Sequence, residues 1–371
     1  MKKKLAIIGA SYLQAPLVLK AKEMGIETHC FAWADRAVCK DIADYFYPIN
    51  VLEKEEILKV CQQVKIDGIT TIATDIVVPT INYVADNMGL ISNPDKYSYV
   101  TTNKYLMRQC FAKNDVPSPK FVDATTDEPD VEGMIFPMIV KPTDRSGSIG
   151  IEKVYDKEEL INAIKRARNY SFKHEAIVEE FVDGCEVSVE SISWKGTHYI
   201  LQITDKVTTE APYFVELEHH QPSMLSDDIQ RRIREIVLKA LDALHIQYGA
   251  SHSELKITKD GDIRVMEIGA RMGGDFIGSN LVRLSTGYDF LKGVINVALG
   301  QFEKPIIKNE HHSGVYFLCK NAERILPVMQ HPEEYPEIIE CNIQSMELKN
   351  IQSSNDRSGY VIYQSDKRWI I

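Results

Sequence analysis

An aspartate–glycine pair at positions 260 and 261 stands between two runs in which apolar and polar residues alternate, GASHSELKIT and IRVMEIGAR. This pair favours a two-residue hairpin loop, because both positions of a type I′ turn need positive φ. Such a loop fixes the register of the two strands and places Glu254 directly opposite Glu267. Because side chains alternate between the faces of a strand, six of them should share one face: Ala250, His252, Glu254, Glu267, Gly269 and Arg271.

Two carboxylates that face each other across a hairpin repel unless something neutralises them, since their Cβ atoms lie about 4.5 to 5.5 Å apart. A divalent cation is one solution. Mg²⁺ binds oxygen ligands and is often held by one or two carboxylates together with substrate phosphates. The alternative is a solvated pair on an exposed edge. Arg271 and the glycines at 273 and 274 lie on the same side or just beyond, so the sequence favours a metal site at Glu254 and Glu267.

The first hundred residues alternate short apolar runs with amphipathic stretches, which predicts a doubly wound parallel sheet. Helices are expected over residues 15–24, 54–64, 103–114, 157–168 and 226–245, with Thr101 or Thr102 capping the third. We expect a Rossmann-like α/β domain over residues 1–100, an α+β nucleotide domain over 101–300 with a lid subdomain at about 118–184, and a small mixed α+β domain over 301–371. Gly9-Ala10-Ser11 lacks the later glycines of a dinucleotide fingerprint.

Composition excludes several classes of function. The formal charge of −10 argues against a general affinity for nucleic acid. No stretch of about 18 apolar residues occurs, which argues against a membrane span. The seven cysteines are odd in number and form no CxxC pair, so we expect reduced thiols and a cytoplasmic location.

Two further segments have the residue types of a nucleotide site. Lys141 ends a buried strand and is followed by a loop of small residues, Ser146-Gly147-Ser148-Ile149-Gly150, whose backbone N–H groups can approach phosphate oxygens. No P-loop motif occurs. The strand Val178 to Glu186 turns acidic at its end, where side chains and backbone can accept hydrogen bonds from adenine and ribose. Taken singly, each of these segments is better explained as an ordinary polar strand end.

Together these elements, in the order Lys104, Lys141 with SGSIG, VEEFVDGCE, then Glu254 and Glu267 with EIGAR, resemble the ATP-grasp superfamily of carboxylate–amine ligases. Within it the chain looks most like the L-amino acid ligase type, through TTEAPYFVELEHHQPS and DRSGYVIY. The resemblance implies a pre-ATP-grasp domain followed by two α+β halves that clamp ATP. It also implies Mg²⁺, with Mn²⁺ as an alternative ion.

The resemblance further implies roles for single residues. Lys104 and Lys141 would contact the phosphates, and Ser146, Gly147, Ser148 and Gly150 would close over them. Adenine would meet Glu179 or Glu180 and the backbone of Phe181 and Val182, and ribose would meet Glu186. Glu254 and Glu267 would bind the metal, and Arg271 would stabilise developing negative charge.

One position departs from the pattern of many relatives, which carry Asn two residues after the second metal glutamate, where this chain has Gly269. The number of metal ions is therefore left open, and water or His252 would have to fill that place.

The segment from Lys206 to Ser223 is expected to supply substrate contacts. Glu216 would hold the amino group of an amino acid, and His219 would help deprotonate the attacking amine, since its ordinary pKa near 6.5 suits that task. Arg283 would pair with a second carboxylate, although a plain helix salt bridge explains it equally well.

These features predict an ATP-dependent ligase that forms an amide or peptide bond through an acyl phosphate. Its partners would be small-molecule carboxylates and amines, with a homodimer allowed and neither nucleic acid nor membrane involved. Two alternatives stay open: a ligase of nucleotide or carbamoyl-phosphate biosynthesis, and a nucleotide-binding scaffold without catalysis.

Overall fold

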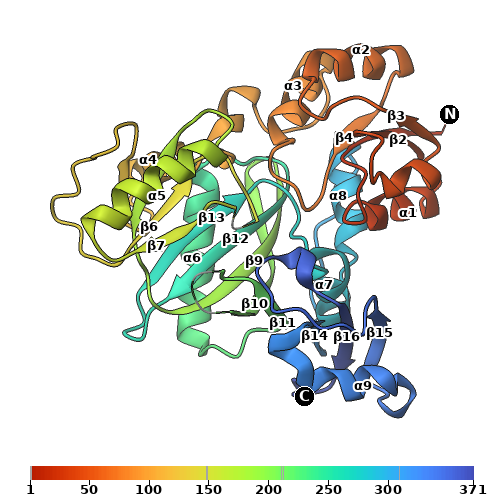
Figure 1. The fold of residues 1–371 in the computed structure, drawn as a ribbon. Coiled ribbons are helices and arrows are strands. Elements are labelled where there is room, and N and C mark those ends of the chain that lie inside the picture. Colours follow the sequence, from red (N-terminus) through yellow and green to blue (C-terminus); the bar gives the residue numbers. More distant parts are fainter. Residues whose placement is uncertain (1, 148, 210, 212, 309) are drawn as a thin grey trace.

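The computed structural model describes residues 2–147, 149–209, 211, 213–308 and 310–371. Its N-terminal part is a parallel sheet with the strand order β3-β2-β1-β4 (Figure 1). The strands are β1 (Lys4–Ile8), β2 (Glu27–Phe31), β3 (Tyr45–Tyr47) and β4 (Gly68–Thr70), and the helices are α1 (Ala15–Glu23), α2 (Lys54–Val64) and α3 (Val78–Met88).

Helices cover both faces of this sheet. Leu5 and Ile7 belong to the apolar core beneath α1 and α8 (Phe290–Ala298), whereas Ala6 and Ile8 belong to the core beneath α2 and α3. The alternation of β1 residues between two cores is what a buried parallel strand requires. The predicted doubly wound parallel sheet is confirmed.

An eight-stranded antiparallel sheet with the order β13-β12-β9-β10-β11-β14-β16-β15 forms the centre of the molecule. Its strands are β9 (Cys185–Trp194), β10 (Thr197–Thr208), β11 (Glu216–Gln221), β12 (Gly249–Ile257), β13 (Ile263–Gly269), β14 (His312–Leu318), β15 (Ile338–Ile343) and β16 (Gly359–Ser365). Helix α6 (Asp227–Ala243) buries its apolar stripe against this sheet. The strands of the last seventy residues thus extend the central sheet (Figure 1).

The lid is a second antiparallel sheet with the order β5-β8-β6-β7, covered by helix α5. Its elements are β5 (Phe121–Asp123), β6 (Met138–Pro142), β7 (Glu152–Val154), α5 (Lys157–Tyr170) and β8 (Ala176–Glu180). The remaining helices are α4 (Lys104–Lys113), α7 (Val282–Thr286), α9 (Leu326–Gln330), a π-helix at Ile277–Leu281, and 3₁₀ turns at Val38–Asp41, Asp95–Thr101, Lys320–Ile325, Pro332–Glu334 and Ser354–Asp356.

Two local predictions are wrong. The cap of α4 is Asn103, whose side chain accepts a hydrogen bond from the Leu106 backbone N–H, rather than Thr101 or Thr102. The hairpin loop has three residues, because Thr258 pairs with Asp262 and Gly261 takes a φ of 81°. A loop of this length commonly ends in a glycine with positive φ.

Two global features complete the description. No helix among the described residues is long and apolar enough to cross a membrane. All seven cysteines are free thiols.

Candidate active site

A cavity of about 290 Å³ lies where the lid, the hairpin and the N-terminal sheet meet. Most of the residues predicted for phosphate, metal and substrate binding line it, although they come from five helices and strands and two loops. The cavity wall includes Lys104, Lys141, Ser146, Gly147, Glu216, His219, Glu254, Glu267 and Arg271.

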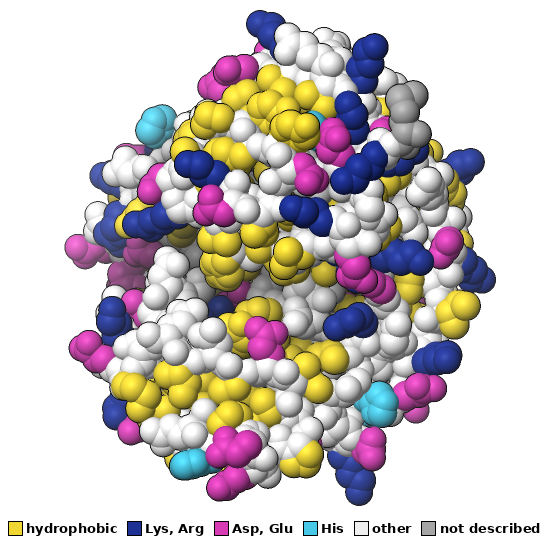
Figure 2. Space-filling view, turned by 90° about the vertical axis from the view of Figure 1, so that its right-hand side faces the viewer, with side chains coloured by type: hydrophobic (Ala, Val, Ile, Leu, Met, Phe, Trp, Pro, Cys, Tyr) yellow, Lys and Arg dark blue, Asp and Glu magenta, His cyan; other side chains and the backbone are white. Residues whose placement is uncertain are grey.

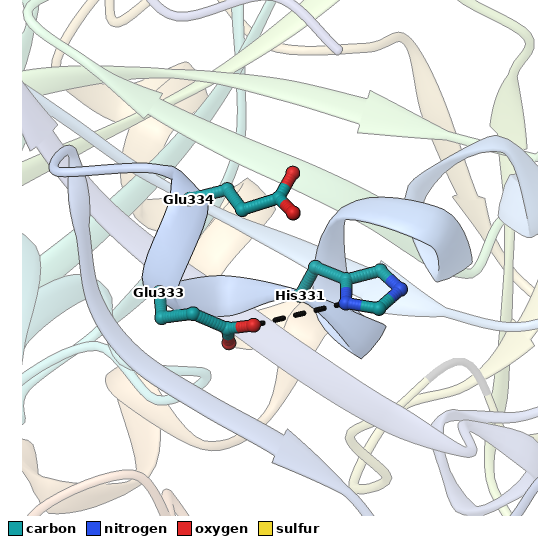
Figure 3. Close-up of side chains that lie close together, drawn as sticks. All are labelled: His331, Glu333 and Glu334. Carbon is teal, nitrogen blue, oxygen red and sulfur yellow. Dashed lines mark ion pairs between the residues drawn. The ribbon is translucent and has the colours of Figure 1, made fainter.

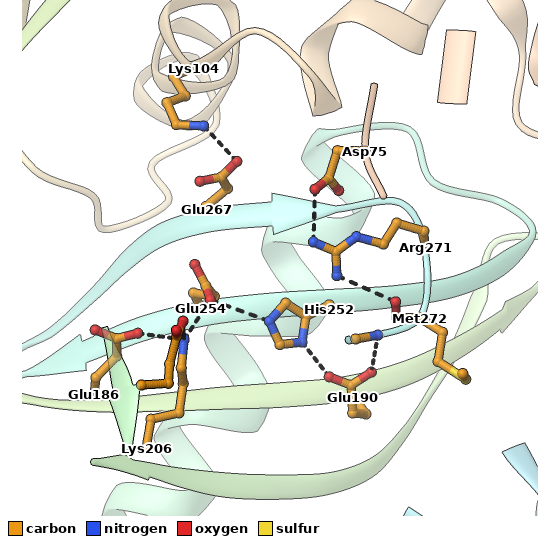
Figure 4. A network of polar contacts seen from close by, with 12 residues as sticks. Asp75, Lys104, Glu186, Glu190, Lys206, His252, Glu254, Glu267, Arg271 and Met272 are labelled. Carbon is orange, nitrogen blue, oxygen red and sulfur yellow. Dashed lines mark hydrogen bonds and ion pairs between the residues drawn. The ribbon is translucent and has the colours of Figure 1, made fainter. Parts of the chain in front are cut away.

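The hairpin presents its two carboxylates as predicted. Glu254 on β12 lies directly opposite Glu267 on β13, so the predicted pairing is confirmed. Each carboxylate has a lysine partner: Lys104 Nζ lies 2.7 Å from Glu267 Oε1, and Lys206 Nζ lies 2.7 Å from Glu254 Oε1 (Figure 4). Two lysines thus already neutralise the pair, a role for which the sequence favoured a divalent cation.

Lys206 on β10 is a site residue that the sequence analysis named only as the start of a segment. Its buried Nζ lies 2.6 Å from Glu186, 2.7 Å from Glu254 and 3.5 Å from Glu216. Burial alone would lower the pKa of Lys206, but these carboxylates outweigh burial and raise it well above the ordinary value. Partial burial acts to raise the pKa of the half-buried Glu254, but Lys206 outweighs it and holds this pKa well below its usual range. Sequence reasoning missed this ammonium because its partners are distant along the chain.

Glu179 lies in the lid core. Its buried carboxylate is 2.8 Å from Arg108 Nε and 2.7 Å from Lys141 Nζ. Burial acts to raise the pKa of Glu179, but Arg108 and Lys141 prevail and lower it. The structure therefore places Glu179 behind Lys141, where it fixes the lysine at the cavity wall. Arg108, fully buried on α4, carried no signal in the sequence.

The other predicted nucleotide residues that the structure describes do not line this cavity. Gly150 has a φ of 74° and packs between Pro142 and Tyr170, and Ser148 lies outside the described residues. The ring of Phe181 lies beneath Lys153, whose Nζ is 3.5 Å from the ring centroid. Glu180, Phe181 and Val182 are absent from the lining of the 290 Å³ cavity, and Glu186 reaches it only through Lys206.

The two predicted substrate residues differ in their surroundings. Glu216 is held between Lys206, at 3.5 Å, and Arg357, at 3.4 Å, so its charge already has partners. His219 is buried at the cavity wall, and neither of its ring nitrogens has a hydrogen-bond partner among the described residues. Burial, with a further contribution from Lys206, lowers the pKa of His219 well below its ordinary value. His219 is therefore a neutral imidazole at neutral pH and a weaker base than the ordinary pKa near 6.5 implied, which corrects the reason given for it in the sequence analysis.

Arg271 is anchored by a residue that the sequence analysis did not name. Asp75, which follows β4 in the N-terminal sheet, places Oδ2 2.8 Å from Arg271 Nη2 (Figure 4). A Cβ atom added at Gly269 would lie 2.2 Å from Asp75 Oδ1. Gly269 thus makes room for Asp75, which explains why an asparagine is not accommodated there. Across the strand, His252 is engaged with Glu190, which also accepts a hydrogen bond from Gly273 N at 2.9 Å.

A family model described as an ATP-grasp domain matches residues 134–279. The chain contains an ATP-grasp domain. It is 26% identical over 303 residues to the alanine–anticapsin ligase of Bacillus subtilis strain 168, an alignment that covers 71% of this chain and 64% of that protein. It is 36% identical over 127 residues to the D-alanine–D-alanine ligase of Flavobacterium johnsoniae, covering 33% of this chain and 38% of that protein.

Solved structures share the ATP-grasp fold over nearly the whole chain. The L-amino acid ligase from Bacillus licheniformis superposes with a TM-score of 0.81 at 23% identity, covering 99% of this chain and 94% of that one. Phosphoribosylglycinamide synthetase from Anaerococcus prevotii superposes with a TM-score of 0.77 at 21% identity, covering 99% of this chain and 95% of that one. At these identities the likeness shows the fold alone.

The ATP-grasp match begins within the lid and ends beyond the glycines that follow Arg271, so it includes both hairpin carboxylates.

Another group of potential metal ligands lies elsewhere, at His331, Glu333 and Glu334 (Figure 3). These side chains are exposed, with 3.7 Å between His331 Nδ1 and Glu333 Oε1. They do not line the ATP-grasp cavity. Exposed acidic groups of this kind commonly occur in proteins without binding an ion.

Proposed function

We propose that this protein is an ATP-dependent carboxylate–amine ligase that forms an amide or peptide bond and releases ADP and phosphate, with an amino acid as one substrate. The observation that carries the proposal is the convergence of Glu254, Glu267 and Arg271 with three lysines, Lys104, Lys141 and Lys206, on one cavity of an ATP-grasp fold. The reaction belongs in the cytoplasm, where ATP is made available and thiols stay reduced.

Under this proposal the phosphates of ATP lie against Lys104 and Lys141, beneath the loop that contains Ser146 and Gly147. Adenine lies beyond this cavity, toward Glu180, Phe181 and Val182, and ribose lies near Glu186. These placements follow the family pattern, and the inward-facing lysines support them.

Glu254 and Glu267 are the residues that fit Mg²⁺, with Mn²⁺ as an alternative ion. Their carboxylates leave facing strands and line the same cavity, and carboxylate oxygens are the protein ligands that Mg²⁺ prefers. When bound, the ion supplies positive charge to the transferring phosphoryl group.

The chemistry begins with a substrate carboxylate, which is a poor electrophile. One of its oxygens attacks the γ-phosphorus of ATP, ADP leaves, and an acyl phosphate forms. The amine of the second substrate then attacks the acyl carbon, an amide bond forms, and inorganic phosphate leaves. Arg271, held by Asp75 at 2.8 Å, stabilises the negative charge on the transferred phosphoryl oxygens. Loss of one such contact costs about 10²- to 10³-fold in rate.

His219 is the group proposed to accept the proton that the amine loses. It lines the cavity, and its imidazole is neutral with both ring nitrogens free of partners among the described residues. Glu216 is already paired with Lys206 and Arg357. Because it also lines the cavity, it is proposed to bind the amino group of the substrate.

The decisive experiment measures phosphate release from ATP and Mg²⁺ over a panel of amino-acid pairs, with mass analysis of the products. We expect release with particular pairs, and loss of release in Glu267→Gln. Glu235→Gln, an exposed glutamate on α6, is the matched control and should retain release. ATP binding without release across the panel would contradict the ligase and favour a non-catalytic scaffold.

A further inference from the structure

A larger cavity, of about 850 Å³, adjoins the smaller one. The two share five lining residues: Leu13, Ala73, Gly274, Asp275 and Ser354. Its walls come from α1 and the preceding loop, from the segment after the hairpin, and from the C-terminal strands. Figure 2 views this side and shows a hollow between an upper and a lower half, with apolar side chains along it. Cavities of about 300 to 1,000 Å³ accept drug-sized ligands, so this one exceeds the needs of a single small amino acid.

One wall of the large cavity comes from the π-helix and α7. Phe276 precedes the π-helix, Ser279 and Asn280 lie within it, Arg283 lies on α7, and all four line the cavity. Ser279 donates a hydrogen bond to Asn280 Oδ1 at 2.7 Å. The amide N–H groups of Asn280 have no acceptor among the described residues, and Asn280 lines the same cavity as Arg283.

The charges on this wall are mostly paired. Arg357 Nη1 lies 2.9 Å from Asp275 Oδ2. Lys20 Nζ lies 2.6 Å from Glu23 Oε2 and 3.0 Å from Asp289 Oδ2. Of the described cations that line the cavity, only Arg283 has no carboxylate partner, and its side chain is exposed. A plain helix salt bridge therefore does not account for Arg283.

We propose that Arg283, assisted by Asn280, binds the carboxylate of the amine substrate, which is an α-amino acid or short peptide with an apolar side chain. A guanidinium matches a carboxylate with two parallel hydrogen bonds. Tyr12 and Leu19, exposed by 61% and 56%, line the same cavity and provide apolar contact.

The assignment to the amine substrate, as opposed to the acyl substrate, rests on the proposed function. The carboxylate that ATP activates is consumed beside Arg271 in the smaller cavity, and Arg271 does not line the larger one. Arg283 lines the larger cavity and not the smaller. A carboxylate at Arg283 thus belongs to the molecule whose carboxylate survives the reaction.

The test is calorimetric titration of the protein, with Mg²⁺ and ADP present, using L-leucine, L-phenylalanine and L-alanyl-L-phenylalanine, each against its C-terminal amide. A charge-assisted pair of this kind predicts that at least one free acid binds about 10- to 100-fold more tightly than its amide. Arg283→Gln should abolish this preference, and Arg283→Lys should restore part of it. Arg232→Gln, on α6 and outside both cavities, is the matched control and should keep the preference.

The inference is overturned if no probe binds, if acid and amide bind equally, or if Arg283→Gln keeps the preference. The same probes are then run in the phosphate-release assay. If the preference for the free acid depends on Arg283 but no pair of substrates releases phosphate, the carboxylate site is supported and the ligase function is contradicted. If phosphate is released but Arg283→Gln does not change the ratio of the KM values for acid and amide, the ligase function is supported and the carboxylate site is contradicted.

Discussion

The contact between Asp75 and Arg271 yields the sharpest prediction, because Gly269 lies directly beneath it. The side chains are 12% and 14% exposed. Removing one partner of a buried ion pair costs about 3 to 5 kcal/mol, because a buried charge is left alone. Since both side chains keep some contact with solvent, we expect Asp75→Ala to cost about 3 kcal/mol.

Gly269→Ala should destabilise the protein through the same contact. Its Cβ would lie 2.2 Å from Asp75 Oδ1, a distance that forces the carboxylate away from Arg271. Overpacking of this kind costs about 1 to 3 kcal/mol. In the Asp75→Ala background that oxygen is absent, so adding the alanine should cost under about 1 kcal/mol, leaving a coupling of roughly 2 kcal/mol between the two positions.

The assay is thermal unfolding of the wild type, both single variants and the double variant. With entropy near 2.1 cal/mol/K per residue, 3 kcal/mol corresponds to about 4 °C in Tm if the chain of 371 residues unfolds together. Glu152→Ala, which breaks a more exposed pair with Arg166, is the control and should cost under about 1 kcal/mol. Equal costs for Gly269→Ala in both backgrounds would refute the proposed steric link.

Three further outcomes follow from the same contacts. His219, whose pKa is lowered by burial first and Lys206 second, contributes stability that is present above about pH 6.5 and is lost as pH falls toward its folded pKa, by up to about 1.4 kcal/mol per unit. The free energy of unfolding of His219→Asn should fall less between pH 7.5 and pH 5 than that of the wild type. An equal fall in both proteins would contradict the contribution of His219. Lys206→Met should lower the Tm measured by calorimetry strongly, because Glu254 and its neighbours lose their shared cation. An unchanged Tm would show that water compensates for the missing ammonium group. Glu179→Gln should destabilise the lid by roughly 3 kcal/mol and weaken ATP binding through Lys141, whereas a change in neither would exclude its positioning role.

Local signals in the sequence predict much of the fold and part of the site. Helix α2 spans Lys54–Val64 as its periodicity predicts, and the parallel sheet follows from the alternation of strand and helix. The residues predicted for phosphate and metal binding line one cavity together with Arg271, and they were predicted from the order of their motifs along the chain. The homodimer and the domain boundaries stay predictions.

The residues that sequence reasoning missed have one property in common. Asp75, Arg108, Lys206 and Arg357 each pair with charged side chains that are remote in the chain or on another strand. No periodicity or spacing reports such a pair, because the partners become neighbours only after the sheets assemble. For this reason the ion pairs of Glu254 with Lys206 and of Glu267 with Lys104 could not be predicted, although Lys104 itself was a predicted site residue, and a metal ion was predicted to neutralise the two carboxylates.

The pairing of Glu254 with Glu267 was predicted from a loop one residue too short, and a bulge explains why it still holds. The three-residue loop shifts the register by one, so that Leu255 faces Val265, and the extra residue on β13, Met266, restores the pairing beyond it. Without that bulge a one-residue slip would turn Glu267 to the other face of the hairpin. The carbonyl of Met266 accepts a hydrogen bond from Arg108 Nη2 at 2.5 Å. The cation that orders the lid through Glu179 therefore also stabilises the bulge that directs Glu267 into the cavity, which ties the two halves of the nucleotide site to one side chain.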